Sequence, residues 1–202
     1  MHIVEAVTED GTRIELRSDG TWSPIGPPPD EIQPKEGFRK ASWGASREDI
    51  QLVEVGEYDV DTPELLVIPA RVGELNFNAV YILLGDQLVR AKYMLTETYQ
   101  NKNHYLNAYE TLKQSLAKKY GQTRSDDTYW SNDLYKDDHQ DWGMAVSCGH
   151  LMQSATWQTT ETDVLLTLDG EGFEVRVGIQ YTGRRLSSLE ASHQEARLLE
   201  DL

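Results

Sequence analysis

The chain has 202 residues and a mass of 23.0 kDa, with 39% hydrophobic and 26% charged residues, a balance typical of one or two folded globular domains. It holds 34 Asp and Glu against 19 Lys and Arg, a formal charge of −15 at pH 7, which opposes direct binding to a nucleic-acid backbone. The longest apolar run, residues 79–84, is far shorter than the roughly 20 residues that a membrane-spanning helix needs. Since no basic and apolar leader opens the chain, we expect a cytoplasmic protein that binds neither nucleic acid nor membrane, or a secreted or periplasmic one if a leader was removed upstream.

Residues 1–25 predict a small three-stranded β-meander with strands at residues 2–8, 13–17 and 22–25. Asp10-Gly11 and Asp19-Gly20 lie between these segments, and Asp-Gly is typical of tight hairpin turns because both residues tolerate positive φ. The pattern from Glu9-Asp10-Gly11 to Asp19-Gly20-Thr21-Trp22 resembles the small SH3-like modules of uncharacterised bacterial proteins. The resemblance implies an SH3-like fold for this part of the chain and assigns it no activity.

A proline-rich segment, residues 26–36, follows the meander. Three consecutive prolines at positions 27–29 deny the backbone hydrogen bonds and favour an extended conformation. We interpret the segment as a semi-rigid linker, with a proline-rich ligand for an aromatic groove as the alternative.

The domain predicted over residues 37–186 begins with an aromatic residue, a basic pair, Trp43-Gly44 and a serine, all ahead of a short helix. Ser46 and Asp49 stand at the spacing of a capping box, with Asp in place of the usual Glu. The arrangement resembles a domain common in uncharacterised bacterial proteins and lipoproteins. The resemblance implies antiparallel strands after the helix and assigns no reaction.

Alternating apolar residues predict strands at residues 65–72, 75–84 and 87–96, joined by tight turns at Gly73-Glu74 and Gly85-Asp86. Pro69 favours an edge position for the first of these strands. An apolar stripe at three- and four-residue steps then predicts a long helix over residues 105–120, which ends at Gly121.

Beyond this helix we expect strands at residues 128–130, 142–148, 151–158, 163–168 and 173–181, and a terminal helix over residues 187–202. The last two strands are expected to join through a turn at residues 169–172, with Phe173 on the apolar face of the final strand. Connections between neighbouring strands are too short for parallel crossovers. The predicted fold is therefore α+β: an SH3-like β-meander, a proline linker, and an antiparallel sheet packed on one long helix.

The sequence contains no P-loop, no Gly-x-Ser-x-Gly elbow and no His-Glu-x-x-His motif. We expect a protein that is not an enzyme and that uses no cofactor or metal. Cys148, the single cysteine, lies in the strand expected at residues 142–148, where apolar neighbours favour a packed core thiol over a reactive one served by His150.

Acidic and aromatic residues are interleaved between residues 126 and 142. Aromatic side chains anchor protein interfaces, and carboxylates select a basic partner and steer its approach. This pattern predicts that the stretch binds a basic protein partner through Tyr129, Trp130, Tyr135, Asp137, Asp138 and Trp142. The competing interpretation is that each of these aromatic residues simply belongs to the core.

Other functions are consistent with the same residues. The net charge suits an acidic inhibitor that imitates nucleic acid and blocks a nucleic-acid enzyme, provided that its carboxylates form an array on one face. The acidic stretch could instead hold a divalent cation in a small metal-dependent hydrolase, although the spacing of its residues matches no EF-hand. The candidate ligands are Asp126, Asp127, Asp133, Asp137, Asp138, His139 and Asp141.

The terminal helix could also bind a partner through Leu198, Leu199 and Leu202, although docking on its own domain is the simpler expectation.

Overall fold

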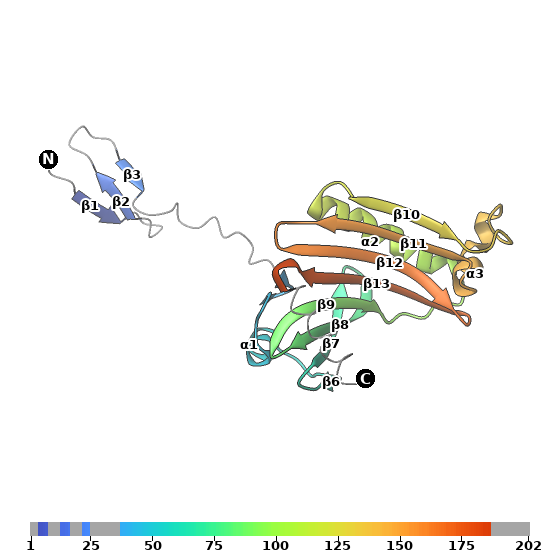
Figure 1. Cartoon of the computed structure of the whole chain (residues 1–202), viewed down its shortest axis with the longest axis horizontal. Coiled ribbons are helices and arrows are strands. Elements are labelled where there is room, and N and C mark those ends of the chain that lie inside the picture. The colour runs from blue at the N-terminus through green and yellow to red at the C-terminus, as the bar shows by residue number, and fades with distance from the viewer. Residues whose placement is uncertain (1–3, 8–12, 17–21, 25–36, 187–202) are drawn as a thin grey trace, which may run out of the picture. The chain divides into compact units, whose positions relative to one another are not determined.

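The computed structural model of the chain describes residues 4–7, 13–16, 22–24 and 37–186 (Figure 1). The chain divides into two compact units, Met1–Lys35 and Glu36–Leu202. Three predicted features lie outside the described residues: the two Asp-Gly turns of the first unit, the proline linker, and the terminal helix over residues 187–202. The fold belongs to the α+β class and its sheets are antiparallel.

The first unit contains three short strands, β1 (Val4–Val7), β2 (Arg13–Leu16) and β3 (Trp22–Pro24). They pair antiparallel in the order β1-β2-β3. The predicted three-stranded meander is confirmed at this level.

The second unit opens with a two-stranded ribbon, β4 (Gly37–Phe38) and β5 (Ala41–Ser42), and a short helix, α1 (Arg47–Val53). The predicted capping box is present, because the Ser46 side chain accepts from the Asp49 backbone N–H while the Asp49 carboxylate accepts from the Ser46 N–H. Four strands follow: β6 (Val60–Asp61), β7 (Leu65–Val72), β8 (Leu75–Leu84) and β9 (Gln87–Leu95).

The long helix α2 (Asn103–Tyr120) separates these strands from a second series. That series consists of β10 (Ser125–Trp130), a 3₁₀ turn η1 (His139–Asp141), helix α3 (Trp142–Ser147), β11 (Leu151–Gln158), β12 (Thr162–Glu171), β13 (Glu174–Gly183) and a final 3₁₀ turn η2 (Arg184–Leu186). Strands β6 to β13 form one sheet in the order β10-β11-β12-β13-β9-β8-β7-β6. Pairing of β13 with β9 therefore joins two consecutive meanders, one on each side of α2 in the sequence.

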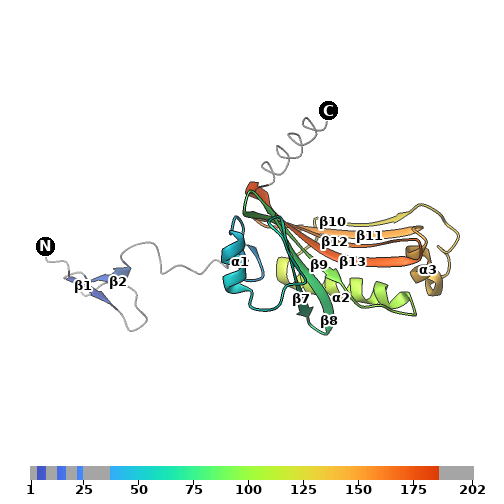
Figure 2. The same cartoon turned by 90° about the horizontal axis from the view of Figure 1, so that it is seen from below.

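Helix α2 covers one face of this sheet (Figure 2). Its apolar stripe is buried as predicted, with Tyr109, Leu112 and Leu116 against the sheet. The opposing side chains alternate along the strands, for example Val164, Leu166 and Leu168 on β12. Within residues 37–186, no helix is long and apolar enough to cross a membrane.

The prediction of an edge position from Pro69 is wrong in detail, because β6 lies outside β7. The two-residue strand β6 pairs only with Leu66 and Val67. Pro69 lies beyond it, where the missing backbone N–H costs no bond to β6.

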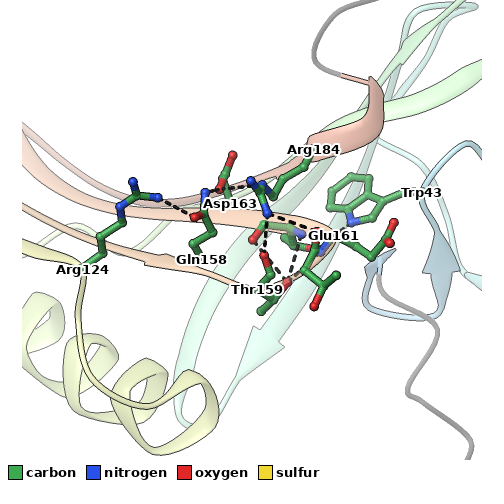
Figure 3. Close-up of polar contacts among 9 residues, drawn as sticks. Trp43, Arg124, Gln158, Thr159, Glu161, Asp163 and Arg184 are labelled. Atoms are coloured by element: carbon green, nitrogen blue, oxygen red, sulfur yellow. Dashed lines mark hydrogen bonds and ion pairs between the residues drawn. The ribbon is translucent and has the colours of Figure 1, made fainter.

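The turn between β11 and β12 is tied to the end of β13 (Figure 3). Nη1 of Arg184 donates to the carbonyl oxygens of Thr159 at 3.1 Å and Thr160 at 3.2 Å. Trp43 Nε1 donates to Thr162 Oγ1 at 2.8 Å, and the Trp43 ring lies so close to Gly183 that a Cβ there would meet it at 3.0 Å. These contacts fix the segment before α1 against the ends of β12 and β13.

Candidate interaction surface

One end of the sheet gathers the C-terminal end of β10, the loop after it, α3, the start of β11 and the β12–β13 turn (Figure 1). We call this region, residues 125–152 and 169–176, the α3 end. Helix α1 lies at the opposite end of the unit (Figures 1 and 2), and we call residues 37–58 the α1 end. The predicted partner-binding residues all belong to the α3 end.

Helix α3 corrects the strand that was predicted at residues 142–148. The helix ends in a Schellman motif: Gly149 has φ of +74°, its N–H donates to the Val146 carbonyl, and the N–H of His150 donates to the Ala145 carbonyl. Because Gly170 on β12 has no side chain, the C-terminal end of α3 can approach it closely; a Cβ at this position would lie 2.5 Å from the Val146 oxygen. A short apolar run is ambiguous between strand and helix, and here the left-handed glycine and the close approach to β12 favour the helix.

The prediction that Cys148 lies in a core strand is therefore wrong. Cys148 is instead the C-cap residue of α3. It is half-buried. It also lines a hollow of about 560 Å³, together with Tyr129, Met152 and Arg176.

Three of the predicted aromatic residues build the loop of the α3 end. The rings of Trp130 and Trp142 meet edge to face at 5.5 Å, and His139 stacks on Trp142 at 4.0 Å. Tyr135 stacks on His150 at 5.6 Å, and Trp142 Nε1 donates to the Lys136 carbonyl at 3.0 Å. Trp130, Tyr135 and Trp142 are half-buried against the core, so these rings both hold the loop and reach the surface.

Tyr129 behaves differently from the other aromatic residues. Its side chain is 60% exposed and points to the face opposite α2, next to its cross-strand partner Met152, which is also exposed. Leu134, at 70% exposure, and Met144 are further exposed apolar residues of the α3 end. Sequence reasoning missed Leu134, Met144 and Met152, because nothing in their local pattern separates an exposed apolar side chain from a buried one.

Phe173 was also missed, because it was predicted on the buried face of the last strand. The hairpin turn is instead Gly172-Phe173, with φ of +61° and +69°, the signature of a two-residue type I′ turn. Asp169 and Gly170, which were predicted in the turn, belong to β12. Phe173 is 66% exposed, so a bulky apolar side chain occupies a left-handed position that favours Gly or Asn.

The carboxylates of the α3 end fall into two groups. Asp126 pairs with Lys113 at 2.9 Å, Asp133 with Lys136 at 3.0 Å, and Asp169 with Arg176 at 2.6 Å. Asp138 accepts from the Gln140 N–H at 2.9 Å and caps η1. Within residues 37–186, five further carboxylates of the α3 end are exposed and have no cationic partner within ion-pair distance: Asp127, Asp137, Asp141, Glu171 and Glu174. The α3 end therefore carries exposed carboxylates without a cationic partner.

The predicted cation ligands do not converge. Nowhere in residues 37–186 do Asp, Glu, His and Cys side chains form a group of three or more that could hold a metal ion.

At the α1 end, a buried carboxylate, Glu54, is paired with a cation of the same end, Arg39. The Glu54 carboxylate is 2% exposed and receives both Nε and Nη2 of Arg39, at 3.1 and 3.0 Å. It also accepts from the Lys40 N–H, while the Tyr58 hydroxyl donates to the Glu54 carbonyl. Burial, and then the nearby Glu54 carboxylate, raises the pKa of Tyr81 far above its ordinary value. This cluster binds β4, β5 and α1 together.

Comparisons with known proteins give no relative for this chain. No protein-family model, no curated protein and no solved structure matches it. We therefore infer function from the geometry of the α3 end.

Proposed function

We propose that the chain is a non-catalytic protein-binding module and that its α3 end binds a basic, partly apolar segment of a partner protein. The observation that carries this proposal is Phe173, a largely exposed aromatic side chain held in a left-handed turn conformation. Strain of this kind is found preferentially where a side chain must be presented for function. Tyr129, Met152 and Leu134 are further exposed apolar residues of the α3 end.

Electrostatics supports a basic partner. Exposed carboxylates at Asp127, Asp137 and Asp141 belong to the same end of the unit as the exposed apolar residues. Complementary charge speeds the encounter of two proteins and rejects acidic competitors, while buried aromatic anchors supply the affinity. Over residues 37–186, 22 Asp and Glu stand against 15 Lys and Arg, so an acidic end lies within a domain of moderate charge.

The first test is affinity capture from a lysate of the source organism at low salt, followed by calorimetry with the purified partner. The double variant Tyr129→Ala/Phe173→Ser is expected to lose the partner while it remains folded. The matched control is Leu52→Ala/Val55→Ala, which removes two exposed apolar side chains at the α1 end. The proposal would be contradicted if the Tyr129→Ala/Phe173→Ser variant retained the partner while the Leu52→Ala/Val55→Ala control lost it.

We further propose that the first unit is an SH3-like module, as its sequence resemblance implies. Support comes from three antiparallel strands in sequential order. Distance restraints from solution NMR on the full chain would test it, because an SH3-like module needs further strands that close these three into a barrel.

A further inference from the structure

The eight-stranded sheet has two edges of very different length. One edge is β6, which has two residues, and the other is β10, which has six. A long edge strand offers a row of backbone donors and acceptors to another strand. Strand β10 belongs to the α3 end.

The hydrogen-bond pattern shows which backbone groups of β10 face outward. The N–H of Ser131 donates to the His150 carbonyl at 2.8 Å, and residues alternate between the two sides of an antiparallel ladder. Asp127 and Tyr129 therefore bond toward β11, while Asp126, Thr128 and Trp130 direct N–H and C=O away from it. In the part of the chain that the structure describes, no hydrogen bond reaches these outward backbone groups.

The side chains of β10 indicate the chemistry of a strand that would fit there. Asp127 and Tyr129 are exposed on the face opposite α2. Asp126, on the α2 face, is already paired with Lys113. A basic side chain on an added strand would thus find its unpaired carboxylate, Asp127, on the open face.

We propose that the partner's segment binds in extended form, adding to β10 as a further antiparallel strand like those of the rest of the sheet, with basic side chains on the face of Asp127 and Tyr129 and apolar side chains on the face of Trp130. This inference rests on the proposed function and specifies how the β10 edge of the α3 end holds one segment of the partner; Phe173, on the turn between β12 and β13, would contact another part of the same partner. Main-chain hydrogen bonds supply affinity in such strand addition, and alternate side chains supply specificity. A second copy of this chain fits less well, because it would bring a second Asp126 and Asp127 onto the same pair of strands.

The probe is a fluorescent octapeptide of alternating Lys and Val with capped ends, followed by fluorescence anisotropy at low salt. In antiparallel addition, the residues that exchange hydrogen bonds lie opposite one another and share a face, so Val residues must bond to Asp126, Thr128 and Trp130 if Lys residues are to face Asp127. Methylation of the Val backbone nitrogens should therefore weaken binding by about tenfold or more. Methylation of the Lys backbone nitrogens should leave it within about twofold of the parent peptide.

The two methylated peptides have the same charge and the same side chains, so they separate strand addition from simple charge attraction. Equal binding of both peptides, strong or weak, overturns the proposal. The reverse order overturns the assignment of the basic residues to the open face.

Matched variants of the protein test the same edge. Thr128→Pro removes an outward N–H without removing a bond to β11, and it should weaken the parent peptide by about tenfold or more, whereas Thr128→Ala should change its affinity by less than about twofold. Circular dichroism checks that the Thr128→Pro variant is folded. If this variant does not fold, the methylated peptides test strand addition on the wild-type protein.

Intact binding of the parent peptide by Thr128→Pro, together with loss of the captured partner by Tyr129→Ala/Phe173→Ser, would leave the proposed function standing and overturn strand addition. Peptide-independent dimerisation that Thr128→Pro abolishes would show that the edge takes a second copy instead, and would likewise overturn the proposal.

Discussion

The α1 end and the α3 end belong to one compact unit, yet they use charged and aromatic residues in opposite ways. At the α1 end, Glu54 is buried and Arg39 reaches it with two nitrogens. At the α3 end, Asp127 and Asp137 remain exposed, and Phe173 and Tyr129 lie at the surface. The difference supports our proposal that the α3 end, rather than the α1 end, binds a partner.

Backbone strain follows the same division. Arg39 and Phe173 both have positive φ, +55° and +69°. The strain at Arg39 accompanies a two-point ion pair with a buried carboxylate, which offsets its cost. At Phe173 the strained residue instead presents an apolar ring to solvent, and such a ring gains most when a partner covers it.

The largest expected effect is at the α1 end. Arg39→Ala leaves the Glu54 carboxylate buried without its cation, and removal of one partner of a buried ion pair costs about 3–5 kcal/mol of unfolding free energy. Urea denaturation measures this, with Lys40→Ala as the control because only its backbone N–H contacts Glu54. A loss below about 1 kcal/mol would show that water or another group replaces the guanidinium.

The next effect concerns the position of α3. In Gly170→Ala the new Cβ would lie 2.5 Å from the Val146 oxygen, so the helix must move, at a cost of about 1–3 kcal/mol. Amide chemical shifts of residues 142–149 should change along with the stability. Gly172→Ala is the control for the chemical shifts alone, since a Cβ there meets nothing within 4 Å although its φ of +61° makes the substitution costly in stability; if both variants shift α3 equally, the close approach is not what positions it.

A smaller effect of opposite sign is expected at Phe173. Phe173→Asn places a residue that tolerates positive φ in the type I′ turn, and it should raise the unfolding free energy by about 1 kcal/mol. The same substitution should weaken partner binding. Thermal unfolding and calorimetry measure the two effects, and a variant that is less stable than wild type would remove the argument from strain.

The smallest effect lies between the two ends, where the segment after β9 leads into α2. The hydroxyl of Tyr99, with the backbone N–H of Asn76, lowers the pKa of Glu97, so this contribution to stability is present above the ordinary pKa of Glu and is lost as the pH falls through the lowered value. Burial, and then the Glu97 carboxylate, raises the pKa of Tyr99 to about 12. Its contribution is therefore present below pH 10 and is lost as the pH rises toward 12.

Tyr99→Phe should return the pKa of Glu97 toward its ordinary value, as followed by carbon-13 NMR during an acid titration. Ultraviolet absorbance of tyrosinate follows Tyr99 itself in the wild-type protein. An unchanged Glu97 titration in the variant would leave the Asn76 amide as the cause of the shift.

Periodicity in the sequence was sufficient to predict the long elements. Strand β8 and helix α2 have apolar residues at steps of two and of three to four, and the capping box at Ser46 was read from two residues. The β12–β13 turn could not be placed in this way. Both the predicted turn and the observed one keep Leu168 and Val177 on the same buried face, so alternation is equally consistent with either. The Asp169–Arg176 ion pair, which exists only in the observed register, was the signal that could have separated them.

The candidate surface was predicted only in part, for a related reason. Tyr129 and the acidic residues come from one stretch of sequence, whereas Met152 and Phe173 come from two later strands and a turn. Register and packing bring these segments together, and a single sequence contains neither. Helix α3 needs the absence of a side chain at Gly170, more than 20 residues away.

Pairing of β9 with β13 has a consequence for how the chain folds. Each meander, β6 to β9 and β10 to β13, contains only pairings between neighbours in sequence, but the seam between them joins residues 90–94 to residues 178–182. Closing so long a loop costs conformational entropy before any contact repays it. We expect the two meanders to acquire protection from hydrogen exchange early during refolding, and the backbone amides of the seam to acquire it last.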